Sequence, residues 1–211
     1  MTQYERQGIE RSTAASWTRL SVLSGIVGGA LMVLTSLALF SVLNELEFAF
    51  VDPLGAVAMV LLALALPALY AHERGWFGRL ATVTFWLLSL GWVVATVGLV
   101  VTTLTMPPVS ETAFLAFLLG LLVAMLGALA FGVAILRADT TAIPRTVGWL
   151  LVAALPVGVP LALGFTTYVM GEAADPWGGP MLFYGLAWVV LGRYLWTHES
   201  ETAGTAAADA R

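Results

Sequence analysis

The sequence predicts an all-α integral membrane protein in which six transmembrane helices form one bundle. Of the 211 residues, 60% are hydrophobic and only 10% are charged, and the mean hydropathy is +0.92, unlike a domain with a solvated surface. Long uncharged runs recur along the chain. One of them, residues 112–136, predicts a helix of about 37 Å, which is enough to cross the roughly 30 Å hydrocarbon core of a bilayer. Arginine occurs only in, or at the edge of, alternate loops between these runs.

The first part of the chain predicts a cytoplasmic tail followed by a retained span. Residues 1–19 are polar and carry three arginines, and Trp17 stands where an interfacial aromatic residue is expected. Residues 20–43 are uncharged and too long for the apolar part of a cleaved signal. They begin a six-helix transmembrane domain, residues 20–197, and Gly25 and Gly29 predict a packing surface in the first span.

The second and third spans are predicted at residues 53–71 and 80–104. Pro53 suits the first turn of a helix, and the acidic segment before it contains no arginine, so that loop is expected outside. The turn between the two spans contains Arg74 and Arg79 around aromatic residues, which indicates a cytoplasmic turn. The third span ends before the prolines at 107 and 108.

The remaining spans are predicted at residues 112–136, 146–170 and 181–196, and residues 198–211 are expected to form a disordered cytoplasmic tail. In the fourth span, small residues recur every four positions and predict close approach of a partner helix. Pro156 and Pro160 predict a kink in the fifth span, because neither has an N–H for the carbonyl four residues earlier. The small residues are Gly120, Ala124, Ala128 and Gly132.

The charges predict that both termini are cytoplasmic and that the protein is a multi-pass protein of the cell (plasma) membrane. All nine arginines fall on the cytoplasmic side or at its edge, whereas the three outer loops hold six acidic residues and no arginine. The absence of lysine and the abundance of alanine favour a prokaryotic source. There is no cysteine, which excludes disulfides and thiolate chemistry.

The sequence predicts no catalytic, cofactor-binding or metal-binding residue, and therefore no enzyme. No ionisable residue lies inside a predicted span, where it would mark a proton relay or an ion site. His72 and His198 are at the cytoplasmic ends of the second and sixth spans and could meet to hold a metal or haem. We interpret them instead as solvated residues at helix ends.

Four residues are the candidates for a solute site or kink: Pro156, Pro160, Ser89 and Thr96. The kink leaves two carbonyl acceptors, and hydroxyls recur every seven residues along one face of the third span. We favour a packing role for both features, with the hydroxyls bonding between helices. Trp86, Trp92 and Trp188 lie deeper than the interfaces, and each is expected to face the bundle.

Three segments resemble a group of small uncharacterised prokaryotic multi-span membrane proteins, the DUF4386-like set. They are PALYAHERGWFGRL at 67–80, IPRTVGWLL at 143–151 and YGLAWVVLGRYLW at 184–196. The resemblance covers about half of the chain. It implies six helices and no settled activity, and it transfers no catalytic residue.

The leading hypothesis is a non-enzymatic partner-binding, regulatory or accessory membrane component. Its expected partners are membrane lipids and either another membrane protein or a second copy, and not nucleic acid. The alternative is a permease or channel for a small neutral or weakly cationic solute at the Pro156/Pro160 kink. A third possibility, an enzyme acting on lipid or quinone, would require a reactive site among the cytoplasmic arginines, which we interpret as topology signals. These are Arg74, Arg79, Arg137, Arg145 and Arg193.

Overall fold

The structure, a computed structural model, is all-α in the part of the chain that it describes, with no strand. The backbone is described for residues 3–40, 45–139, 141–170 and 176–209, and the side chains for 17–40, 51–139, 141–169 and 176–198. The elements are α1 (Gln3–Leu39), α2 (Glu45–Glu73), α3 (Arg79–Leu104), α4 (Val109–Arg137), α5 (Arg145–Ala153), α6 (Gly158–Phe165), a π-helical turn η1 (Thr166–Met170) and α7 (Gly178–Asp209).

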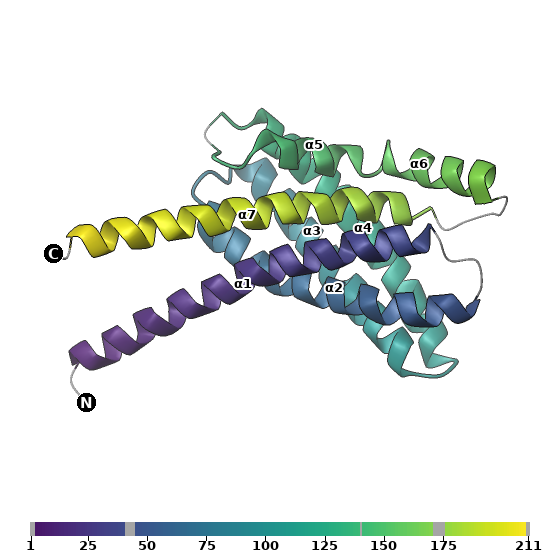
Figure 1. Cartoon of the computed structure of the whole chain (residues 1–211), viewed down its shortest axis with the longest axis horizontal. Helices are drawn as coiled ribbons and strands as arrows, with labels where there is room; N and C mark the ends of the chain where they lie inside the picture. Colours follow the sequence, from purple (N-terminus) through teal and green to yellow (C-terminus); the bar gives the residue numbers. More distant parts are fainter. Residues whose placement is uncertain (1–2, 41–44, 140, 171–175, 210–211) are drawn as a thin grey trace.

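The helices run up and down in alternation and form one bundle (Figure 1). One end of the bundle holds the α2–α3 turn and the α4–α5 loop, with Arg74, Arg79, Arg137 and Arg145; we call it the arginine end. The opposite end, which we call the acidic end, holds Asp52, the α3–α4 turn and Glu111. Both termini extend beyond the bundle at the arginine end (Figure 1). The charges are therefore segregated along the bundle axis.

Four helical segments are long and apolar enough to cross a membrane: Trp17–Leu39, Val51–Glu73, Arg79–Leu104 and Val109–Arg137. The pair Arg145–Ala153 and Gly158–Val169, bent by 51°, would make a fifth. These apolar helices indicate membrane association. The sixth predicted span falls in α7, which does not meet the same criterion in its described part because glycines, tyrosines, tryptophans and Arg193 interrupt its apolar run.

Helices α3 and α4 form the closest pair, and small residues make this possible. A Cβ on Gly91 would lie 2.4 Å from the backbone nitrogen of Ala124, and one on Gly120 would lie 2.4 Å from that of Ala95. Ala124 and Ala128 are fully buried. Further along the same stripe, Gly132 packs against α5. The predicted inward-facing stripe of α4 is confirmed, and its partners are α3 and α5.

Helix α1 packs between α2 and α7 in the same manner. A Cβ on Gly25 would lie 3.2 Å from the Ala65 side chain, and one on Gly29 would lie 2.8 Å from the Gly185 carbonyl oxygen. The packing surface predicted from these two glycines is confirmed. The α3–α4 pair is a separate unit. It contacts the rest of the bundle mainly through α2 and α5.

The fifth predicted span is broken as the prolines require. Helix α5 ends at Ala153 and α6 begins at Gly158, so Pro156 lies in the break and Pro160 in the first turn of α6, where a missing N–H costs little. Helix α7 packs directly against the break, because the backbones of Gly158 and Gly179 are in close contact. Glycine at both positions allows this approach.

The structure differs from the sequence prediction at several places. Helix α2 begins at Glu45, so Pro53 lies inside it and not in its first turn. Thr96 bonds within its own helix and not between helices.

The predicted tail at 198–211 is helical through Asp209, because α7 continues without interruption into an alanine-rich segment of high helix propensity. Trp86, expected to face the bundle, is 55% exposed. It lies only two turns from the start of α3 and contacts Tyr70 and Phe85, so it belongs with the interfacial aromatic residues.

Candidate ligand pocket

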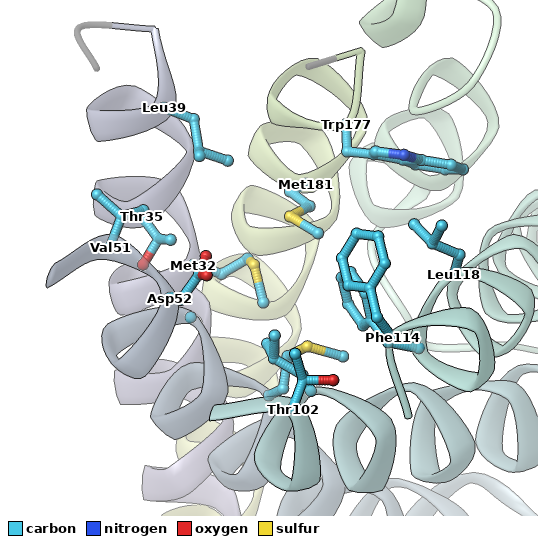
Figure 2. Close-up of a pocket in the computed structure, with 14 residues that line it drawn as sticks. Met32, Thr35, Leu39, Val51, Asp52, Thr102, Phe114, Leu118, Trp177 and Met181 are labelled. Carbon is cyan, nitrogen blue, oxygen red and sulfur yellow. The ribbon is translucent and has the colours of Figure 1, made fainter. Parts of the chain in front are cut away.

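A pocket of about 430 Å³ opens at the acidic end between α1, α2, α3, α4 and the start of α7 (Figure 2). Its volume lies in the ordinary range of small-molecule sites, roughly 300–1,000 Å³. In Figure 1 the α3–α4 pair runs obliquely to α2, and both contribute residues to the lining. The pocket is lined by Met32, Thr35, Leu39, Val51, Asp52, Gly55, Met59, Leu99, Thr102, Phe114, Phe117, Leu118, Trp177 and Met181.

The lining combines adaptable apolar side chains with very few polar groups. Three methionines come from three different helices, α1, α2 and α7, and their unbranched thioethers adapt to irregular ligand shapes. Phe114, Phe117 and Trp177 supply aromatic surface, and Figure 2 shows Phe114 and Trp177 facing the pocket across from Asp52. Asp52, which is exposed, is the one charged residue in the lining.

The pocket is closed toward the middle of the bundle. The carbonyl oxygen of Met59, a lining residue, accepts a hydrogen bond from Trp92 Nε1 at 3.1 Å. The Trp92 ring stacks on Tyr184 with 4.5 Å between ring centroids, and both side chains are fully buried. This stack joins α3 to α7 next to Met59, so buried side chains fill the bundle on this side of the pocket.

The four candidate residues from the sequence lie elsewhere, and the structure does not bring them together at this pocket. Thr96 donates its hydroxyl to the carbonyl oxygen of Trp92 in its own helix at 2.8 Å. Ser89 is buried, and its hydroxyl has no hydrogen-bond partner among the described residues. The Pro156/Pro160 break packs against α7, whereas α3 packs mainly on α4 and α2. Sequence spacing alone does not specify which helices are neighbours.

A second polar cluster lies at the arginine end around Glu73, the last residue of α2. This side chain is only 4% exposed. Its carboxylate accepts hydrogen bonds from Trp76 Nε1 at 2.6 Å and from the Tyr194 hydroxyl at 3.1 Å, and His72 Nδ1 lies 2.8 Å from Oε1. A buried carboxylate requires such partners. The cluster therefore ties the α2–α3 turn to α7.

The two histidines meet beside this cluster. The ring centroids of His72 and His198 are 6.3 Å apart, and His198 Nδ1 lies 3.0 Å from the Tyr194 carbonyl oxygen. In the part of the chain that the structure describes, no group of three or more His, Cys, Asp or Glu residues could hold a metal ion. The two rings are in edge-to-face contact, and the hydrogen bond that joins the two helix ends is the one between Tyr194 and Glu73.

Sequence reasoning missed both Glu73 and the pocket residues. A signal for Glu73 was present, because Trp76 follows it by three residues and can reach back to it within one turn. The pocket methionines gave no spacing signal, since they are far apart in the sequence.

No protein-family model matches this chain, and the comparisons with curated proteins and with solved structures also give no match. The functional argument therefore rests on the geometry of the pocket.

Proposed function

We propose that the chain is a six-span protein of the cell membrane, with both termini in the cytoplasm, that binds a mostly apolar small molecule in the pocket at its acidic end. It acts as a non-enzymatic regulatory or accessory component rather than as a catalyst. The segregation of arginine to one end of the bundle supports this orientation, because arginine-rich loops are retained in the cytoplasm. The pocket would then open toward the outer face.

The observation that carries the proposal is the methionine- and aromatic-lined pocket of about 430 Å³. A conduit would require polar groups continuing through the bundle. Below Met59 the interior is occupied by the stacked Trp92 and Tyr184 and by fully buried aliphatic residues such as Leu62 and Leu121. This closed floor favours binding over transport.

The alternative, a permease for a small neutral or weakly cationic solute, is supported by the 51° bend between α5 and α6. It receives less support from the surroundings of the bend, because Gly158 is in close contact with Gly179 and Pro180 of α7.

Relationship to the DUF4386-like group is part of the same proposal. Two of the three resembling segments meet through the Glu73–Tyr194 hydrogen bond, which supports treating them as one structural feature.

Alkylation of single cysteines separates these functions, because the natural chain has no cysteine. Leu118→Cys reports on the pocket, and Ser89→Cys and Thr96→Cys report on a path through the bundle. With the full chain in lipid vesicles, N-ethylmaleimide should label only the Leu118→Cys variant. Labelling at Ser89→Cys or Thr96→Cys at a similar rate would favour the permease, and an unreactive Leu118→Cys variant would overturn the pocket.

Gly55 provides a matched control for this labelling. A Cβ on Gly55 would make only ordinary contacts, 3.4 Å from Thr35 Cγ2 and 4.0 Å from Leu99 Cδ2, so the backbone tolerates a side chain there. Gly55→Ala in the Leu118→Cys background should leave the labelling rate unchanged, whereas Gly55→Leu should fill the pocket and lower the rate at least about tenfold. Equal rates in the two variants would show that the reagent reaches Leu118→Cys from outside the pocket.

A further inference from the structure

We infer that the bundle binds a single water molecule in its interior, where the water accepts hydrogen bonds from the Tyr184 hydroxyl and the Trp188 indole N–H. The inference is independent of the pocket at the acidic end and goes beyond the proposed function. It rests on a buried hydroxyl that no described residue pairs, on a small cavity that the same tyrosine lines and on the size of that cavity.

The Tyr184 hydroxyl is a buried donor without an acceptor. The side chain is 0% exposed, and its hydroxyl has no hydrogen-bond partner among the described residues. Burying a hydroxyl without a partner is costly, and most buried polar atoms in proteins have one. The ring is fixed by its stack on Trp92, with 4.5 Å between ring centroids. Trp188 cannot take the hydroxyl proton, because an indole N–H can only donate.

A cavity of about 10 Å³ lies among α2, α3, α4, α5 and α7, and Tyr184 and Trp188 both line it. They are the only two of its lining residues whose side chains carry a polar atom. One water molecule requires roughly 10–15 Å³ of such space. The cavity therefore has room for one water and for nothing larger.

One water in this cavity satisfies both donors. Tyr184 and Trp188 are four residues apart on α7, so their side chains lie on the same face of the helix, and their ring centroids are 6.3 Å apart. Buried waters bind in this way, by pairing two or more polar groups that the protein itself leaves unpaired. An apolar occupant would leave the hydroxyl proton unpaired, so the geometry favours water.

Ser89 provides a matched comparison. Its hydroxyl is also buried and has no hydrogen-bond partner among the described residues, but Ser89 lines neither this cavity nor the pocket at the acidic end. The two hydroxyls therefore differ in whether a water-sized space adjoins the residue that carries them.

The first test compares the removal of each hydroxyl from the full chain, by sodium dodecyl sulfate denaturation in mixed micelles. Tyr184→Phe should raise the unfolding equilibrium constant about tenfold, because it removes one hydrogen bond of the bound water. Ser89→Ala should leave that constant unchanged or lower it, because it removes a hydroxyl that has no partner. A Tyr184→Phe variant at least as stable as the natural chain would overturn the inference.

The second test separates a bound water from a direct contact between Tyr184 and Trp188. A short X-ray pulse converts bound water into hydroxyl radical, which oxidises the aromatic ring beside it. In the full chain in detergent micelles, Tyr184 should be oxidised at least tenfold faster than Phe85, with each rate taken relative to the unfolded chain. Phe85 is the control because it is 2% exposed and does not line the cavity. Equal relative rates would overturn the bound water, even if Tyr184→Phe destabilises the protein.

Discussion

Glu73 shows how a single buried carboxylate can connect distant parts of a mostly apolar chain. Removing a carboxylate from water is costly, and the cost is offset only when its oxygens keep strong hydrogen bonds. Trp76 and Tyr194 donate to its two oxygens, and His72 lies within hydrogen-bond distance of Oε1. The three partners come from α2, the α2–α3 turn and α7. The carboxylate therefore joins the end of α2 and the α2–α3 turn to α7.

Glu73→Ala should destabilise the protein by about 1–3 kcal/mol, because it leaves the buried Tyr194 hydroxyl and the partly buried Trp76 N–H without their acceptor. The control is Glu111→Ala, since Glu111 is exposed in the first turn of α4 and its loss should change stability by less than about 0.5 kcal/mol. Denaturation by sodium dodecyl sulfate in mixed micelles, followed by circular dichroism, measures both variants. Equal stabilities for the two would indicate that the Glu73 hydrogen bonds contribute no net energy.

Three tryptophans define what could be predicted at the scale of single residues. Their positions within the predicted spans, away from the span ends, predicted that Trp86, Trp92 and Trp188 face the bundle. This is confirmed for Trp92 and Trp188, which are 0% and 3% exposed. Trp86 is exposed because the face of a helix that meets lipid depends on where its partners lie. An apolar sequence does not distinguish lipid from protein neighbours, since both are equally apolar surroundings.

Small residues are the feature of individual helices that the sequence predicted best. In a bilayer there is no hydrophobic force between helices, so close packing over small side chains drives association, and such residues are visible as a four-residue repeat. The repeat in α4 identified the packing face, although its partners, α3 and α5, came only from the structure. The bend at Pro156 was predictable for the same local reason, whereas its contact with Gly179 was not.

Gly91→Ala should separate α3 from α4 and lower stability by about 1–3 kcal/mol. The added Cβ would lie 2.4 Å from the Ala124 nitrogen, a backbone atom that cannot move aside without moving the helix. The matched control is Gly164→Ala in α6, where a Cβ would meet nothing within 4 Å. That variant should be neutral or more stable by about 0.5–1 kcal/mol through helix propensity. The same detergent denaturation measures the difference, and a Gly91→Ala variant as stable as Gly164→Ala would contradict the packing account.

At the scale of the whole molecule, the two ends of the bundle differ in charge, and the pocket that Asp52 and Met181 line lies at the acidic end. The alternation of arginine-bearing and acidic loops was readable from the sequence, because retention of arginine during insertion depends on loop composition alone. The pocket was not readable, since its lining residues lie far apart in the sequence. Residues from five helices or their ends contribute to it, and no local pattern marks them.

The number of crossings is decided by where the two ends of α3 and the end of α7 lie relative to the membrane. Gly75→Cys and Thr105→Cys stand on the turns before and after α3, and Thr197→Cys stands near the arginine end of α7. We expect an impermeant maleimide to label only Thr105→Cys in intact cells, and all three after the membrane is opened, because arginine-bearing loops stay in the cytoplasm. Labelling of Thr197→Cys from outside, with Gly75→Cys protected, would mean that α7 does not cross and that the spans number five. Labelling of Gly75→Cys with Thr105→Cys protected would invert the orientation and turn the pocket toward the cytoplasm.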